Sequence, residues 1–236
     1  MHVSAVIAAG GRGRRMNSSL SKQFLCIKGH PILSYTLNTF ETLDKIQEIV
    51  LVVGKADMDY TREQIIKKYR YKKVRLIEGG QERQDSVYNG LRAVAPQTDI
   101  VVIHDAVRPF VKKNMILESI EAAKNYGAVG VAVPVKDTIK VVGENGIIKN
   151  TPERKYLWAI QTPQTFKYDL IVYAHEKARK DGFYGTDDAV LVERLGHDVK
   201  IIEGAYENIK ITTPEDIIIA ENFVALGYGD FRRFPR

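Results

Sequence analysis

The chain has 236 residues, of which 44% are hydrophobic and 27% charged, a composition typical of a globular protein with a core of its own. Its formal net charge of +6 favours anionic ligands, but it does not distinguish nucleic acid from small phosphates. Cys26 is the single cysteine, which excludes an intrachain disulfide, and no run approaches the roughly 20 apolar residues of a membrane-spanning helix. The apolar residues 3–9 lead into a glycine- and arginine-rich loop without the spacer of a secretory signal, so we expect a cytoplasmic protein.

Short runs rich in Val and Ile alternate with helical patterns along the first half of the chain. Continuous apolar runs indicate buried strands, and apolar residues spaced by three and four indicate amphipathic helices. In chain order, the pattern predicts a strand at 3–8, a helix at 32–43, a strand at 48–53, a helix at 59–69, a strand at 74–77, a helix at 83–94, a strand at 100–103, a helix at 113–126 and a strand at 128–133.

This alternation predicts the α/β class, with a Rossmann-like, mostly parallel mixed sheet and helices on both of its faces. Ligands of such sheets bind beyond the carboxyl ends of the strands. Four loops are therefore expected on one rim, those after Ala8, Ile77, Ile103 and Val133.

The alternation breaks between residues 134 and 161. Residues 138–142 and 147–150 flank the turn signal Asn145-Gly146, which predicts a β-hairpin. A two-stranded hairpin alone is marginally stable in water. We therefore expect a protruding arm over about residues 135–160 that leans on a second copy of the chain and forms a homodimer.

Beyond the arm the pattern predicts helices at 170–180 and 187–195 and a strand at 199–202. A last helix is expected from Pro214, capped by Thr213. No linker is long enough to divide the chain, so residues 1–236 are expected to form one domain.

The loop after the first strand is the strongest local signal for a binding site. Its sequence from Ala8 to Met16 is AAGGRGRRM, and Ser21-Lys22-Gln23 follows shortly after. Glycines let the backbone approach a ligand closely, and cations at the same place suit a polyphosphate. The loop lacks the third glycine of a dinucleotide fingerprint, and the chain has no P-loop motif. A solvated basic turn is the alternative interpretation.

Several further motifs occur in an order typical of one known family. They are GGQERQDSV (79–87), HDAVRPF (104–110), PVKDT (134–138), NTPER (150–154), QTPQ (161–164), TDDA (186–189) and NIKIT (208–212). With the glycine loop, they resemble the 2-C-methyl-D-erythritol 4-phosphate cytidylyltransferase family of the nucleotide-sugar pyrophosphorylase superfamily. The resemblance covers nearly the whole chain.

The resemblance implies transfer of CMP from CTP to 2-C-methyl-D-erythritol 4-phosphate in non-mevalonate isoprenoid precursor biosynthesis, with release of pyrophosphate and Mg²⁺ as cofactor. The acceptor phosphate would attack the α-phosphorus of CTP, a reaction in which a protein acts mainly by alignment and charge stabilisation. It implies catalytic cations at Arg15, Lys22 and Lys210. It implies nucleotide contacts at Ala8, Ala9, Gly10, Gly11, Gly13, Gly80, Gln81, Ser86 and Asp105, with Asp105 also near the metal. It implies acceptor contacts at Arg108, Thr138, Arg154, Thr162 and Thr186, of which Thr138 and Arg154 would reach into the site of the other subunit.

The residues considered alone leave other roles open. Ser86 suits the first turn of a helix, and Asp105 suits a helix cap or a partner for Arg108. The threonines suit turns or caps, and Lys210 suits an exposed surface. We expect Asp57 to cap the helix that follows it, and Arg83 to pair locally with Glu82 or Asp85.

Three other functions compete with the implied one. A ribitol-5-phosphate cytidylyltransferase would share the nucleotide loop and the His-Asp-x-Val-Arg-Pro segment. A nucleotide-sensing module without catalysis would keep the glycine loop but would not need both Arg15 and Lys22. A nucleic-acid-binding protein is the third and weakest alternative, and nucleic acid is not expected as a partner, because the aromatic residues do not interleave with a basic face.

Overall fold

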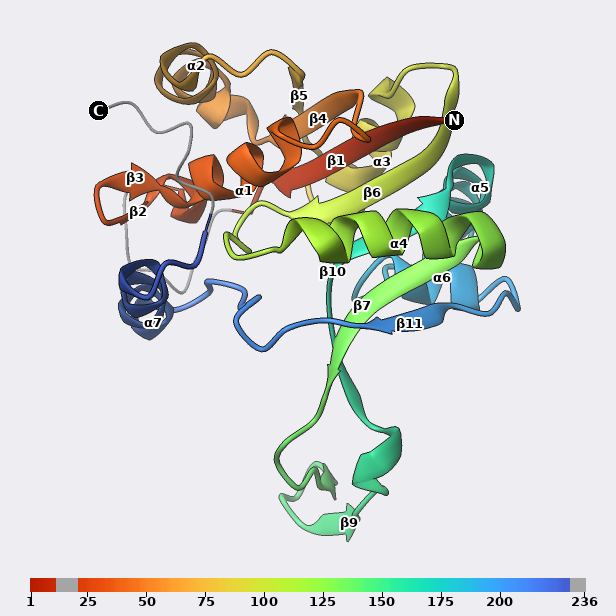
Figure 1. The fold of residues 1–236 in the computed structure, drawn as a ribbon. Coiled ribbons are helices and arrows are strands. Elements are labelled where there is room, and N and C mark those ends of the chain that lie inside the picture. Colours follow the sequence, from red (N-terminus) through yellow and green to blue (C-terminus); the bar gives the residue numbers. More distant parts are fainter. Residues whose placement is uncertain (12–20, 230–236) are drawn as a thin grey trace.

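The computed structural model describes residues 1–11 and 21–229. At its centre lies a seven-stranded sheet with the strand order β11-β7-β10-β6-β1-β4-β5 (Figure 1). Neighbouring strands are parallel except at β10, which is antiparallel to both of its neighbours. The strands are β1 (His2–Ala9), β4 (Glu48–Val53), β5 (Val74–Glu78), β6 (Thr98–Asp105), β7 (Ala128–Pro134), β10 (Trp158–Lys167) and β11 (Lys200–Glu203). The predicted α/β class is confirmed, and every strand expected in the sheet is present.

Strand β10 is the one member of this sheet that the sequence pattern does not predict. It contains Gln161, Thr162, Pro163 and Gln164, and proline removes a hydrogen-bond donor that an interior strand normally needs. The pairing of β10 with β7 changes register between Ile160 and Gln164. Pro163 therefore falls where the ladder is interrupted, which makes an interior position possible.

Helices cover both faces of the sheet, as predicted. Alternate side chains of β1 point to opposite faces, with Ile7 in one apolar core and Val6 in the other. The first core contains side chains of α1 (Ile32–Glu41) and α4 (Lys113–Tyr126). The second contains side chains of α3 (Arg83–Ala93), α5 (Tyr168–Lys180) and α6 (Ala189–Glu193).

The remaining elements are short or lie at the margin. The helix expected at 59–69 begins as α2 (Met58–Tyr60) and continues as the π-helix η4 (Thr61–Lys67). Strands β2 (Cys26–Ile27) and β3 (His30–Pro31) form a small antiparallel pair, and three 3₁₀ turns are η2 (Lys22–Phe24), η3 (Lys55–Asp57) and η5 (Arg154–Tyr156).

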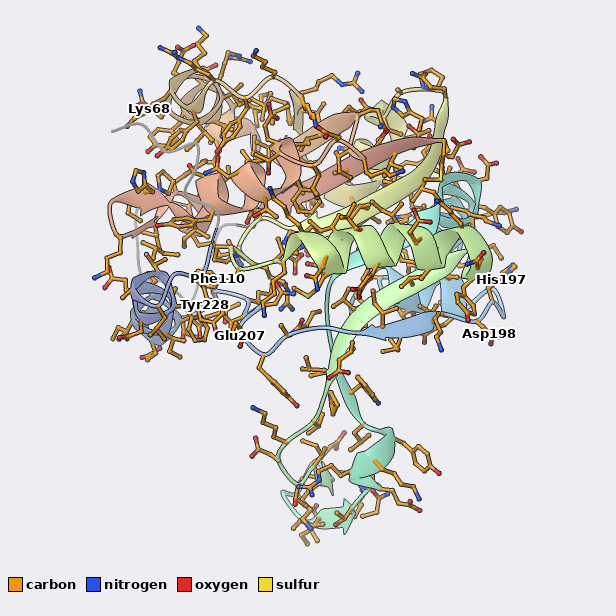
Figure 2. All side chains as sticks on the ribbon, in the orientation of Figure 1. Lys68, Phe110, His197, Asp198, Glu207 and Tyr228 are labelled. Atoms are coloured by element: carbon orange, nitrogen blue, oxygen red, sulfur yellow. The ribbon has the colours of Figure 1, made fainter. Side chains whose placement is uncertain are left out.

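Helix α7 (Pro214–Ala225) closes a third, smaller core. Thr213 and Asp216 form a capping box at its start, which confirms the predicted cap. Phe223 on α7 packs against Phe110 and Tyr228, which lie beside this helix in Figure 2. In the described part of the chain, every helix falls short of the length and apolar character needed to cross a membrane.

The expected hairpin lies between β7 and β10 and projects away from the sheet (Figure 1). Its paired strands, β8 (Val141–Val142) and β9 (Ile148–Asn150), are shorter than predicted. Gly146 has a φ of 77°, which is the conformation that the Asn-Gly signal requires. Large apolar side chains on this segment are exposed, namely Ile139, Val141, Val142, Ile147, Ile148, Tyr156, Trp158 and Ile160.

Candidate active site

A cavity of about 900 Å³ opens beyond the carboxyl ends of β1, β4, β5 and β6. The loops after Ala8, Ile77 and Ile103 reach it, as the strand-end rule predicts. The loop after Val133 does not reach it, because this strand continues into the arm. The predicted residues that line the cavity are Ala8, Ala9, Gly10, Gly11, Lys22, Gly80, Gln81, Ser86, Asp105 and Lys210.

One wall of the cavity is backbone packed closely around the Ser86 hydroxyl. The Gly80 N–H donates to Ser86 Oγ at 3.1 Å, and Ser86 is 3% exposed. A Cβ at Gly79 would lie 2.7 Å from Ser86 Oγ, and one at Gly80 would collide with the Asp85 side chain. Because no side chain fits at these two positions, the backbone faces the cavity directly.

Lys22 enters the cavity from the start of η2, next to Gly11. Its two neighbours in sequence are held by one carboxylate. Ser21 Oγ donates to Asp57 Oδ2 at 2.8 Å, and Gln23 Nε2 donates to the same oxygen at 3.2 Å. Asp57 therefore anchors the segment that carries Lys22. It occupies the N-cap position of α2, as expected, but its side chain makes no capping hydrogen bond there.

Lys210 reaches the same cavity from near the C-terminus, on a segment held against β10 and the loop that follows β6. Asn208 Nδ2 donates to the carbonyl of Thr162 at 2.9 Å, and the Ile211 N–H donates to the carbonyl of Val107 at 2.9 Å. Hydrogen bonds to segments distant in sequence thus place Lys210 at the cavity, where it pairs with Asp105, so a free surface charge does not describe it.

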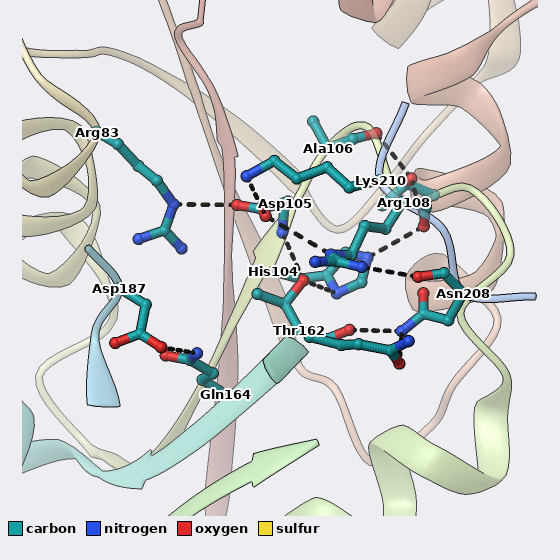
Figure 3. A network of polar contacts seen from close by, with 12 residues as sticks. Arg83, His104, Asp105, Ala106, Arg108, Thr162, Gln164, Asp187, Asn208 and Lys210 are labelled. Atoms are coloured by element: carbon teal, nitrogen blue, oxygen red, sulfur yellow. Dashed lines mark hydrogen bonds and ion pairs between the residues drawn. The ribbon is translucent and has the colours of Figure 1, made fainter. Parts of the chain in front are cut away.

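Asp105 ends β6 among three cations (Figure 3). Its Oδ1 accepts a hydrogen bond from Arg83 Nε at 3.0 Å, and its Oδ2 lies 2.8 Å from Lys210 Nζ and 3.7 Å from Arg108 Nε. Burial alone raises the pKa of Asp105, but the charges of Arg83 and Lys210 outweigh burial and hold this pKa well below its ordinary value. The carboxylate is therefore ionised at neutral pH, and its pairing with Arg108 is among the roles that the sequence left open.

Arg83 joins Asp105 to a second buried carboxylate, Asp188. Arg83 Nη2 lies 2.8 Å from Asp188 Oδ2, so the expected local pairing of Arg83 with Glu82 or Asp85 is wrong. Burial raises the pKa of Asp188, but the charge of Arg83 lowers it below its ordinary value. Sequence reasoning assigned Asp188 no role at the site, and its place in the TDDA motif is the only signal that marks it.

Hydrogen bonds that involve His104 and Thr162 fix the backbone of Asp105. His104 Nε2 faces the Arg108 carbonyl at 3.2 Å and must donate to it, so in the neutral ring Nδ1 accepts from Thr162 Oγ1 at 2.9 Å. Thr162 Oγ1 in turn accepts the Asp105 N–H at 3.1 Å. Burial lowers the pKa of His104 to about 4, which keeps the ring neutral.

The other predicted residues do not line this cavity within the described part of one chain. Arg108 is half-buried, and its Nη1 donates to the Asn208 carbonyl at 2.7 Å. Thr138 and Arg154 are exposed on the arm, and Thr186 is exposed elsewhere. Gly13 and Arg15 lie outside the described residues.

Residues 1–11 and 21–229 contain no group of three His, Cys, Asp or Glu side chains that could hold a metal ion. Mg²⁺ needs only one or two carboxylates when phosphate oxygens and water complete its coordination. The ionised Asp105 on the cavity wall fits such a donor set, and Glu78 and Glu82 also line the cavity. The site is therefore suited to a cation that arrives with a polyphosphate.

Known proteins match this chain in both sequence and fold. Residues 3–225 match the model of the IspD family, 2-C-methyl-D-erythritol 4-phosphate cytidylyltransferase. The chain belongs to this family. The resemblance carried by the motifs is thereby confirmed.

Relatives and solved structures of the family cover almost the whole chain. The 2-C-methyl-D-erythritol 4-phosphate cytidylyltransferases of Caldanaerobacter subterraneus and Geobacillus kaustophilus are 52% and 51% identical to it, over 95% of this chain and 99% and 98% of theirs. The 4-diphosphocytidyl-2C-methyl-D-erythritol synthase of Anaerococcus prevotii has a TM-score of 0.86 at 37% identity, over 95% of this chain and 96% of that one. The cytidylyltransferase of Thermus thermophilus has a TM-score of 0.78 at 31% identity, over 95% and 100% of the two chains.

Proposed function

We propose that this protein transfers CMP from CTP to 2-C-methyl-D-erythritol 4-phosphate, giving 4-diphosphocytidyl-2-C-methyl-D-erythritol and pyrophosphate on the non-mevalonate route to isoprenoid precursors. Family membership supports this activity. The structural observation that carries it is the meeting of Lys22 and Lys210 at one cavity walled by glycine backbone. Two cations beside exposed backbone suit a nucleoside triphosphate.

The cytosine ring is read mainly by backbone. In this proposal Ala8, Ala9, Gly80 and Gln81 contact the base edge, with help from the Ser86 hydroxyl. Groups fixed in the backbone discriminate by shape, so we expect them to favour cytosine over a larger purine. Gly10 and Gly11 would contact the triphosphate through their backbone, and Gly13 is assigned the same role by the family motif.

The transfer is a displacement at the α-phosphorus. An oxygen of the acceptor phosphate forms a bond to this phosphorus, while the bond to the bridging oxygen of the β-phosphate breaks and its electron pair leaves with pyrophosphate. Arg15, Lys22 and Lys210 neutralise the negative charge that develops on these oxygens. No covalent intermediate with the protein is required.

Mg²⁺ is the proposed cofactor. Asp105, together with phosphate oxygens, would hold the ion. The bound cation supplies further neutralisation of charge on the phosphates. The role of Asp105 within the chain is to keep Lys210 beside the same oxygens.

The acceptor is assigned to residues on both sides of a dimer interface. Arg108, Thr162 and Thr186 of one subunit would contact it, and Thr138 and Arg154 of the other would hold its phosphate. The exposed apolar side chains of the arm support a homodimer, because a patch of this kind normally meets a partner. We assign residues 1–236 to one cytidylyltransferase domain with an arm at about 135–160, and a cytoplasmic location agrees with a single cysteine.

A pyrophosphate-release assay tests the proposed function. Purified protein with Mg²⁺ receives ATP, CTP, GTP or UTP in turn, each with 2-C-methyl-D-erythritol 4-phosphate or ribitol 5-phosphate. We expect release only with CTP and the methylerythritol phosphate. Release with ribitol 5-phosphate instead would identify the sister activity, and CTP binding without release would identify a nucleotide-sensing module.

A further inference from the structure

We infer that Asp188 is a positioning residue for cytidylyl transfer, which acts through Arg83 to hold Asp105 and Lys210 in place at the cavity. Asp188 does not line the cavity and has no direct contact with the substrates in the proposed arrangement. The inference rests on the roles proposed above for Asp105 and Lys210.

Arg83 spans two carboxylates with one rigid group. Its Nε lies 3.0 Å from Asp105 Oδ1, while its Nη2 lies 2.8 Å from Asp188 Oδ2. A guanidinium is planar, so fixing two of its nitrogens fixes the whole fork. With Asp188 in place, Arg83 cannot turn without breaking one of these pairs, and the position of the Asp105 carboxylate is set accordingly.

Asp188 is itself held from several elements. Its N–H donates to Gln164 Oε1 on β10 at 3.1 Å. Its Oδ1 lies 3.3 Å from Nε2 of His175 on α5, and the two side chains are 1% and 0% exposed. Asp188 is thus fully enclosed beside α5 and β10, where side chains have little freedom to move.

Asp188, Arg83, Asp105 and Lys210 form a line of alternating charges from the interior to the cavity. Each charge in this line stabilises its neighbour. Asp188 and Asp105 are buried carboxylates, and a buried charge is unfavourable unless an opposite charge accompanies it. Arg83 forms ion pairs with both carboxylates, and Lys210 forms an ion pair with Asp105 at the cavity. Without the charge of Asp188, Arg83 pairs with Asp105 alone, so its guanidinium is free to rotate. The Asp105 carboxylate then shifts relative to Lys210.

The primary test is the isosteric variant Asp188→Asn, with Arg179→Gln as its matched control. Arg179 makes an ion pair of 3.0 Å to Asp85 on the same helix as Arg83 but does not touch the line from Asp188 to Lys210. We expect Asp188→Asn to lower kcat about 10- to 100-fold, a range typical of groups that orient a functional residue. The KM for CTP, and CTP affinity measured by calorimetry, should change less than about twofold, since the base contacts and Lys22 remain and Lys210 acts mainly on charge that develops during the transfer. Arg179→Gln should leave kcat unchanged.

A double-mutant cycle with Lys210→Ala shows whether the effect passes through the proposed line. If Asp188 acts through Lys210, the variant with both changes should lose little more kcat than Lys210→Ala alone. If the kcat losses of the two single variants multiply in the double variant, or if Asp188→Asn has a normal kcat, the inference is overturned while the role of Lys210 stands. A normal kcat in Lys210→Ala would overturn the proposed role of Lys210 and the inference with it.

A folding defect does not prevent the test. If Asp188→Asn lacks the circular dichroism spectrum of the unmodified protein, Arg83→Lys takes its place, because a lysine keeps the charge but cannot span two carboxylates. A lowered kcat with unchanged CTP affinity in Arg83→Lys would support the inference. A normal kcat in this variant would overturn it.

Discussion

Single carboxylates hold the cationic side chains of the cavity in place. Asp57 anchors the residues on both sides of Lys22, and Asp105 receives Lys210 at 2.8 Å. Both lysines are therefore placed before a substrate arrives. Charge stabilisation is most effective under this condition, because the groups need not reorganise during the reaction.

Replacing Lys22 by alanine should lower kcat about 10²–10³-fold, since a preorganised charge on the phosphates is lost. The fold should remain, because the side chain lines an open cavity. Steady-state pyrophosphate release and circular dichroism measure the two effects. Lys45→Ala, which removes an exposed lysine outside the cavity, is the control and should leave kcat unchanged. A normal rate in Lys22→Ala would remove this residue from the mechanism.

Replacing Asp57 by alanine should lower kcat by up to about 10²-fold, because a small displacement of a positioned group has effects of this size. Asp57→Asn keeps an oxygen that can accept from Ser21 and Gln23, so its loss should be smaller. Asp59→Ala is the control, since Asp59 is 93% exposed and pairs only with Arg62 in the described structure. Equal activity in the alanine variants of Asp57 and Asp59 would contradict the anchoring role.

At the scale of elements, β10 links the arm to the cavity. The strand leaves the arm near Trp158 and carries Thr162 and Gln164 into the network around Asp105 and Asp188. A partner that binds the arm would therefore bind a strand that also supports the Asp105 carboxylate. Dimer formation and the geometry of the site are expected to be coupled through this strand.

Mixed dimers test whether a site is shared between subunits. Arg154→Ala and Lys22→Ala should each have strongly lowered activity as homodimers, because every site lacks one group. In a purified heterodimer of the two, one site has both groups intact, so about half of the normal activity should return. The measurement is pyrophosphate release from heterodimers isolated with two affinity tags. An inactive heterodimer of confirmed composition would show that Arg154 does not serve the opposite site.

At the scale of the whole molecule, buried ionisable groups connect folding stability to pH. Burial lowers the pKa of His104 to about 4 in the folded chain. In the unfolded chain the ring takes up a proton near pH 6.5. Protons therefore favour the unfolded chain between these two values. The pKa values of Asp105 and Asp188 are also lowered, so their contribution is present above about pH 4, the ordinary range of an aspartate, and is lost as the pH falls further.

The free energy of unfolding should decrease by up to about 3 kcal/mol as the pH falls from 6.5 to 4, through His104 alone. Denaturant unfolding at several pH values measures this change. His104→Asn should flatten the decrease in this window, whereas His197→Gln should not, because His197 is exposed. A stability that stays level down to pH 4.5 in the unmodified protein would contradict the neutral buried ring.

Much of the fold could be predicted from local pattern. Buried parallel strands need continuous apolar runs and the helices that cover them need one apolar face, so β1, β4, β6 and α4 are visible in the sequence. The cap at Thr213 was equally predictable, because capping depends on neighbours a few residues away. The glycines and lysines of the cavity could be named from their motifs and from the rule that ligands bind at strand ends.

The remaining features depend on which distant segments meet. Gln164 and Asp188 look like surface residues in the sequence, and they become buried only because β10 inserts between β6 and β7. There, hydrogen bonds and ion pairs offset the loss of water around the polar groups. Arg83 has acidic neighbours in the sequence but pairs with carboxylates from β6 and the start of α6, since packing of α3 against the sheet brings those within reach. Local pattern carries no information about such partners, because their distances are set by the packing of the folded chain.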